Sequence, residues 1–518
     1  MRNLLRHAAQ AAAMAAVAVM VLAACGCSTK KNTAASRNYQ AFITRYNVYF
    51  NGDEHYKETL KAMENSYEDD YSATLFTHPA EAHGAKQAPQ PSGDFTRSIE
   101  KAQKAIQLHS IKKRPKRKQG KGSDPAYKAW LKRDEYNPFL HNAWMMMGRS
   151  QYMGGDFMGA ASTFYYISKH FTWLPATVTE AKLWQARSYI ALDWLFEAET
   201  VLSQVKEKDL TSATLRNLNN LVRADFYVRS AEYAQALPYL EAAAATAKGT
   251  QKARLYFLLG QAYTRTGDKQ RAYAAFGKVA GSGSAPYRTQ FNARIRQSEV
   301  YSGANVAPEV NALKRMTRYD RNKEYLDQIY YAIGNLYMSR QDTAKAIPNY
   351  ILAAEKSTRN GIDKAISQIT LGEIYFAQGK YDLAQPRYAE ALPQLPDNYP
   401  NYDTLKRRSD VLDEMAVYSH NVVLQDSLLR LSAMTDDERM AVINRIIDEL
   451  NKREREEAEA AKREAYLAEQ QANGQQNRTN ANTPNSFTLN TDDSWYFYNS
   501  ATVASGRTEF QRRWGSRK

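Results

Sequence analysis

Residues 255–280 read LYFLLGQAYTRTGDKQRAYAAFGKVA, and this stretch decides the fold of the 518-residue chain. Its first half places Tyr256, Leu259, Gly260 and Tyr263 at positions i, i+3, i+4 and i+7, which form one face of a helix. A Gly-Asp break follows, and the second half places alanine, phenylalanine and valine along the inner face of a second helix. One small residue in each helix lets the two approach closely, so the stretch predicts a tightly packed helical hairpin.

The same hairpin recurs along the chain. The small residue of the first helix stands at intervals of 38, 38, 36, 74 and 38 residues, at Gly148, Ala186, Ala224, Gly260, Gly334 and Gly372. The small residue of the second helix repeats with the same intervals, at Ala160, Ala198, Ala236, Ala272, Ala346 and Ala384. The interval of 74 is a double step with Ser298 in the missing first helix, so we expect seven units, the fifth degenerate. This pattern is a tetratricopeptide repeat. It predicts an all-α fold, a right-handed α-solenoid over residues 131–400 whose first helices line a concave face.

The N-terminus predicts export and lipid attachment. Two arginines precede about 17 apolar or small residues, the pattern of a signal peptide over residues 1–24. Both cysteines of the chain follow at once, Cys25 and Cys27, and the residues before Cys25 match a bacterial lipoprotein cleavage site. We expect Cys25 to carry the lipid, with Cys27 as the alternative, on a tether over residues 25–35. No acidic residue follows before Asp53, so the expected location is the outer membrane, facing the periplasm.

Residues 36–130 form an N-terminal helical region in this interpretation. Residues 36–63 are expected to be a helical hairpin broken at Asn51-Gly52, with a second helix reaching about Asp70. Residues 94–110 form an amphipathic helix.

Between these helices, residues 77–93 are rich in Pro, Gly, His and Ala. His78 and His83 flank Glu81 there, so a metal site is one interpretation. A solvated loop is favoured, because nothing fixes a ligand geometry.

The net charge of +15 is concentrated in two places. Residues 112–121 hold seven basic residues and no acid, and residues 507–518 add five basic residues against one glutamate. Nucleic acid as a partner is excluded by the expected compartment rather than by the charge. The basic loop 112–121 is interpreted as solvated, with binding to anionic lipid or peptidoglycan as the alternative.

The C-terminal part changes character beyond the repeats. Residues 401–471 are expected to form long helices, with a capping box at Thr435 and Glu438. Residues 472–494 predict a disordered linker, and residues 495–518 form a tail rich in aromatic and basic residues. The tail either folds back on the solenoid or binds a partner. We favour partner binding, with these candidate residues: Trp495, Tyr496, Phe497, Tyr498, Phe510, Arg512, Arg513 and Trp514.

Several segments together resemble one family of bacterial lipoproteins. They include CSTKKNT, SRNYQAFITRYNVYFNG, KKRPKRKQGK, NKEYLDQIYYAIGNLY and WYFYNSATVASGRTEFQRRWGSRK, and they are similar to the PorW/SprE family of the Bacteroidetes. The resemblance implies a role in the type IX secretion system and in gliding motility, with components of the secretion machinery as partners. The cysteine that it implies as the lipid carrier is Cys27, whereas the local cleavage pattern prefers Cys25. Members of that family also continue beyond the RRWG segment, whereas this chain ends at Lys518.

Catalysis is not expected. The sequence has no Walker loop, HExxH or G-x-S-x-G motif, and it implies no cofactor. Two other non-enzymatic interpretations compete with a secretion adaptor. One is a SusD-like glycan-binding lipoprotein, which contiguous repeats without long insertions disfavour. The other is a lipoprotein of outer-membrane protein assembly, which is usually about half this length.

Overall fold

The computed structural model describes residues 28–462, apart from 87, 359–360, 396–398, 400, 453, 456–457 and 459–461. Within these residues the regular structure is entirely helical. The chain divides into two compact units, residues 1–419 and residues 420–518. The signal peptide, both cysteines, the linker and the aromatic tail predicted from the sequence lie outside the described residues.

The first helix that the structure describes in the first unit is long. It consists of α2 (Ala34–Ile43), a π-helical stretch η1 (Thr44–Tyr49) and α3 (Phe50–Ser66), which follow one another without a gap. The predicted break at Asn51-Gly52 is therefore wrong, and the helix ends at Ser66 rather than near Asp70. Gly52 serves packing instead of a turn, since a Cβ there would lie 2.6 Å from Met146 Cε and 3.0 Å from Lys101 Cβ. Helix α4 (Thr96–His109) packs beside α3.

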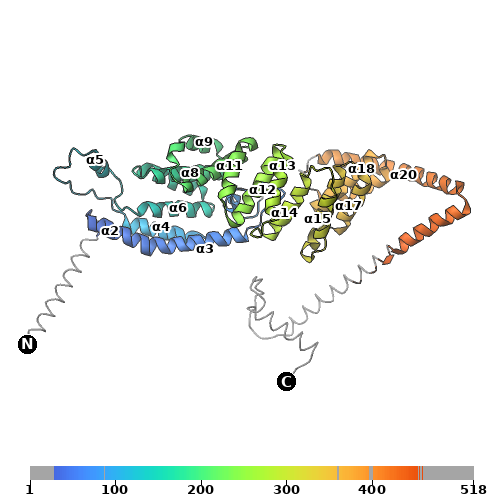
Figure 1. Ribbon diagram of the computed structural model, residues 1–518, viewed down its shortest axis with the longest axis horizontal. Coiled ribbons are helices and arrows are strands. Elements are labelled where there is room, and N and C mark those ends of the chain that lie inside the picture. Colours follow the sequence, from blue (N-terminus) through green and yellow to red (C-terminus); the bar gives the residue numbers. More distant parts are fainter. Residues whose placement is uncertain are drawn as a thin grey trace, which may run out of the picture. The chain divides into compact units, whose positions relative to one another are not determined.

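Seven pairs of helices then follow in the predicted order (Figure 1). The pairs are α6 (Leu140–Met153) and α7 (Phe157–His170), α8 (Pro175–Ala191) and α9 (Leu195–Leu202), α10 (Ala213–Arg229) and α11 (Tyr233–Thr246), α12 (Gly249–Arg265) and α13 (Lys269–Ala280), α14 (Tyr287–Glu299) and α15 (Ala307–Met316), α16 (Leu326–Met338) and α17 (Thr343–Lys356), α18 (Ile362–Ala377) and α19 (Tyr381–Ala391). In each unit the second helix begins nine residues after the small residue of the first helix, as with Gly260 and Lys269. The chain is thus an all-α tetratricopeptide-repeat solenoid.

All twelve small residues of the two repeat markers are buried. Where the first helix carries glycine, an aromatic ring from the second helix lies over it, and a Cβ on that glycine would come within 2.5–3.0 Å of the ring. The rings stand four residues after the second-helix alanine: Phe164, Phe276, Tyr350 and Tyr388. The two units with alanine in the first helix have leucine there instead, Leu202 and Leu240. Glycine in the first helix is therefore paired with an aromatic ring in the second helix. Alanine in the first helix is paired with a smaller side chain, as close packing requires.

The fifth unit departs from this scheme. Helix α14 ends at Glu299, directly after Ser298, whereas α12 continues five residues beyond Gly260 to Arg265. The lost turn is replaced by residues 300–306. As a result α14 packs mainly on α13, and α15 packs on α16. The degenerate unit is present, but its two helices do not form a close pair.

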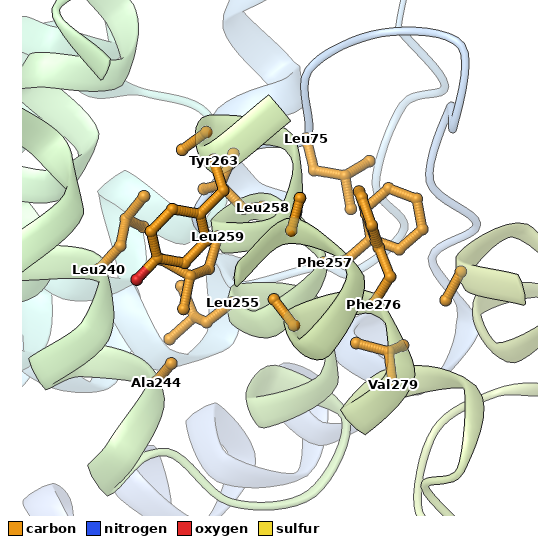
Figure 2. Packing of buried hydrophobic residues seen from close by; sticks show 14 of the residues in the cluster. Leu75, Leu240, Ala244, Leu255, Phe257, Leu258, Leu259, Tyr263, Phe276 and Val279 are labelled. Carbon is orange, nitrogen blue, oxygen red and sulfur yellow. The ribbon is translucent and has the colours of Figure 1, made fainter. Parts of the chain in front are cut away.

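The largest hydrophobic cluster of the first compact unit is centred on the fourth repeat. Figure 2 shows Leu240, Leu259 and Tyr263 on one side of α12 and Phe257 with Phe276 on the other. Leu75, from the segment between α3 and α4, lies beside those two rings. A segment far away in the sequence therefore completes the core of a repeat.

Beyond the repeats, α20 (Tyr402–Ala433) begins in the first unit, where Leu405 and Leu412 are buried against the seventh repeat. In the second unit, Thr435 and Glu438 form the predicted capping box: Glu438 N donates to Thr435 Oγ1 at 3.4 Å, and Thr435 N donates to Glu438 Oε2 at 3.0 Å. The helix that follows exposes four apolar residues, Ile443, Ile446, Ile447 and Leu450.

Among the helices that the structure describes, none is both long enough and apolar enough to cross a membrane.

Candidate functional site

Each first helix carries a polar residue directly after its small residue. These seven positions form one row along the solenoid: Arg149, Arg187, Asp225, Gln261, Glu299, Asn335 and Glu373. We call the surface formed by the first helices on this side the first-helix groove. In the second to fifth repeats the groove is occupied by the chain's own segment from Tyr67 to Gly84, which follows α3 and ends with the turn before α4.

Two nearly buried ion pairs fix this segment in the groove. Glu81 accepts from Arg187 of α8 at 2.9 Å, and Asp69 accepts from Arg254 of α12 at 2.8 Å. Their side chains are between 0% and 8% exposed. A buried charge without its partner is strongly unfavourable. Each carboxylate therefore holds the segment at one position in the groove.

Between the ion pairs the groove holds the backbone of the segment. Gln261 bonds it twice: its Nε2 donates to the carbonyl of Ala73 at 2.7 Å, and its Oε1 accepts from the amide of Leu75 at 3.0 Å. Gln251 Nε2 donates to the carbonyl of Thr77 at 2.6 Å. Such bonds go to the main chain of the segment and do not depend on its side chains.

Side chains of the segment fill the spaces between neighbouring first helices. Tyr71 lies with its ring centroid 5.2 Å from that of Phe257, and its hydroxyl is hydrogen-bonded to Thr289 Oγ1 at 2.7 Å. Leu75 is 3% exposed. Ring contacts and the buried leucine add apolar burial to the polar bonds.

The carboxylate of Glu81 is the centre of a buried charged cluster. Besides Arg187, it accepts from the amide and the hydroxyl of Thr77, at 3.0 and 2.7 Å. Burial alone would raise the pKa of Glu81, but Arg187, Thr77 and Arg229 outweigh it, so this pKa is lowered. Asp225 is buried nearby, and burial together with the charge of Glu81 raises its pKa well above the ordinary value. Within one cluster the pKa of one carboxyl group is therefore lowered and that of its neighbour is raised.

The prediction of a solvated loop over residues 77–93 is wrong for residues 77–82, whereas most of the described residues from 85 to 93 are exposed or half-buried and lie outside the helices. Thr77, His78 and Glu81 are buried, and residues 79–84 form the 3-10 turn η2 (Pro79–Gly84). The segment escapes notice in the sequence because its partners lie more than 100 residues away, as Arg187 does from Glu81.

The alternative metal interpretation has no geometric support either. His78 Nδ1 accepts from Ala80 N at 3.2 Å, and His78 Nε2 lies 3.1 Å from Glu64 Oε1. Glu81 is engaged by Arg187. Among the described residues no group of three or more His, Cys, Asp or Glu side chains could hold a metal ion.

The groove remains open past Tyr71, over α14, α16 and α18. This open part has a volume of about 450 Å³. Its carboxylates are Asp69, Asp70, Glu299, Asp327 and Asp363, and its apolar lining is Ile295, Tyr331 and Ile366. The two cations in its wall are already engaged within the chain, since Arg288 lies 3.7 Å from the ring of Tyr325 and Arg296 donates to the carbonyl of Tyr71 at 2.9 Å.

The other end of the row is closed by α20. Arg408 of α20 pairs with Glu373 and lies 4.5 Å from the ring of Phe376. The open part over α14, α16 and α18 is the candidate binding site.

Comparisons with known proteins agree with the repeats. Two family profiles described as tetratricopeptide repeat match residues 253–281 and residues 325–397. The first covers α12 and α13, and the second covers the sixth and seventh units. Repeats of this class build scaffolds for protein–protein interaction, and they are typically not enzymes.

Among solved structures, the chain is similar to the TPR domain of P58(IPK) at 12% identity, over 62% of this chain and 94% of that chain, with a TM-score of 0.17. A TM-score at this level carries no argument about arrangement or function. A search of curated proteins finds no match.

Proposed function

We propose that the protein is a lipid-anchored scaffold of the outer membrane that faces the periplasm and serves type IX secretion. The repeats support the scaffold. The resemblance of the segments quoted above supports the secretion role, and the cysteine pair after the apolar N-terminus supports the anchor.

The observation that carries the scaffold is the way in which the groove holds residues 67–84. The chain's own segment illustrates the binding mode: a non-α-helical segment with a turn at residues 70–73 and the 3-10 turn η2, bonded through its backbone and anchored by a charged side chain near each end. The open part offers the same kind of surface to another chain.

The charge of the open part selects the partner. Its carboxylates outnumber its two cations, and both cations are engaged within the chain. An extended segment with basic side chains and an apolar residue would pair with Asp70 and Asp363 while packing on Tyr331. We therefore expect a basic peptide segment of a secretion component as the partner.

A photo-crosslinking amino acid in place of Gln328, which lines the open part, tests this in intact cells. It should capture a component of the secretion machinery, whereas the same amino acid in place of the exposed Glu197 on α9 should not. The double variant Asp70→Lys/Asp363→Lys should lose the crosslink and the secretion of type IX cargo.

The matched control is Glu197→Lys/Glu199→Lys, with the same charge change on the exposed side of α9. If the Asp70→Lys/Asp363→Lys variant lost the crosslink but still secreted cargo normally, the secretion role would be refuted. The proposal of a binding site in the open part would still stand. An unchanged crosslink in the Asp70/Asp363 variant would refute the binding site.

A further inference from the structure

The basic loop belongs to a long insertion between α4 and α6. The two ends of this insertion lie side by side. Tyr136 N donates to the carbonyl of Ile111 at 3.0 Å, and Ile111 N donates to Glu135 Oε1 at 2.8 Å. Ile111 is fully buried. Between these two ends the chain contains only one regular element, α5 (Pro125–Leu131).

The loop has a defined position next to the start of the described chain. Asn32 Nδ2 donates to the carbonyl of Lys113 at 2.6 Å. The guanidinium of Arg37 lies 5.1 Å from the ring of Trp130 in α5, and Trp130 stacks on Tyr127 at 5.6 Å. Tyr127 in turn accepts from the amide of Lys118 at 2.8 Å. The residues just after the two cysteines therefore lie against the loop.

The charge of this end of the molecule is almost entirely positive. Residues 28–37 and 112–133 together carry thirteen Lys and Arg side chains and a single carboxylate, Asp124. Asp124 is engaged in capping α5, where its Oδ1 accepts from the amides of Ala126 and Tyr127. The seven cations of the loop itself are all exposed: Lys112, Lys113, Arg114, Lys116, Arg117, Lys118 and Lys121.

The nearest other acids do not neutralise the loop. Glu135 is buried and accepts from Ser110 Oγ and from backbone amides. Asp134 is exposed and lies 2.8 Å from His170 Nδ1. The cations of the loop thus project a field with no counter-charge of the protein's own among them.

We propose that the loop 112–121 is a docking surface for a bilayer of anionic phospholipid. The attraction between clustered Lys or Arg side chains and an anionic membrane surface is well established. The orientation of this surface rests on the proposed lipid attachment, which would tie residue 28 to the membrane within a few residues. The loop then lies against the headgroups and fixes how the solenoid stands on the membrane, a second signal beside the acyl chains.

The test uses the chain from Ser28 to Lys518, which has no cysteine to carry a lipid. Binding is measured by sedimentation with vesicles of phosphatidylethanolamine that contain phosphatidylglycerol, and with vesicles of phosphatidylcholine alone. The protein should bind the anionic vesicles and not the neutral ones, and added salt should release it. The triple variant Lys116→Ala/Arg117→Ala/Lys118→Ala should bind about 100-fold more weakly.

The matched control is Lys314→Ala/Arg315→Ala/Arg318→Ala, which removes three exposed cations from the fifth repeat. It should bind as the unaltered chain does. Equal losses in the two variants would overturn the proposal, because net charge and not the loop would then be responsible. Retention on purified peptidoglycan without binding to anionic vesicles would overturn it in favour of the cell wall. Neither outcome depends on lipidation or secretion, so a failure here is distinct from a failure of the proposed function.

Discussion

The fit between glycine and an aromatic ring in the repeats can be tested at Gly260 and Phe276. A Cβ on Gly260 would lie 2.6 Å from Phe276 Cε1 and 2.8 Å from Cδ1 and Cζ. The ring is fully buried, so close packing leaves it little space to move aside. Gly260→Ala should therefore cost about 1–3 kcal/mol through overpacking, offset by about 1 kcal/mol of helix propensity.

The second change is Phe276→Leu, which creates a small cavity. It should cost about 1–2 kcal/mol, less than the roughly 3–5 kcal/mol of truncation to alanine. The double variant Gly260→Ala/Phe276→Leu recreates the pair that the third unit already uses, Ala224 with Leu240. Its stability should return to within about 1 kcal/mol of the unaltered chain, so the two changes should couple by about 1–2 kcal/mol.

Native-state hydrogen exchange, read by mass spectrometry on peptides from α12 and α13, gives the local free energy of opening for each variant. Gly281→Ala is the control, because a Cβ there has only ordinary contact, 3.4 Å from Gly277 O. The effect of Gly281→Ala on the local free energy of opening should simply add to that of Phe276→Leu. Additive effects for Gly260→Ala as well would refute the idea that glycine is there to admit the ring.

Three further predictions concern the buried charges and the anchor. Arg187→Met leaves the carboxylate of Glu81 buried alone and should destabilise the chain by about 3–5 kcal/mol in urea unfolding, while Arg187→Met/Glu81→Leu should recover most of the loss. Because burial and the charge of Glu81 raise the pKa of Asp225, its contribution to stability is complete below the unfolded pKa and is lost as pH rises through the folded value. Asp225→Asn should remove that decline from the pH profile of the unfolding midpoint, and an unchanged slope would contradict it. Radiolabelled palmitate should remain in Cys27→Ala and be lost or moved in Cys25→Ala; label lost only from the former would identify Cys27 as the lipid carrier.

The repeats were predictable because their signal is local and redundant. Two small residues twelve positions apart, such as Gly260 and Ala272, recur with identical intervals. Each pair encodes a contact within one hairpin, so the sequence alone gives the units and their register. The departure of the fifth repeat was also indicated, by Ser298 in place of glycine or alanine, but the shortening of its first helix was not.

The segment in the groove was not predictable in the same way. Asp69 and Arg254 are separated by 185 residues, and neither belongs to a periodic pattern that would connect them. Gly52 misled for a related reason: glycine after asparagine is typical of a turn, but here it admits a neighbouring helix. The row that begins with Arg149 and includes Gln261 was the available signal, since a polar residue at the same position of every first helix indicates a common surface.

The sign of the charge along the first-helix groove explains why the chain covers only part of it. Where the segment lies, the first helices provide Arg187 and Arg254. These side chains pair with Glu81 and Asp69 of the segment. Past Tyr71 the wall becomes acidic and its cations are already engaged. An acidic segment that continued in this direction would meet like charge, whereas a basic one would meet the carboxylates of Asp70 and Asp363. The same groove therefore accepts its own segment in one part and disfavours it in the next, and this repulsion helps to keep the open part available for a different chain.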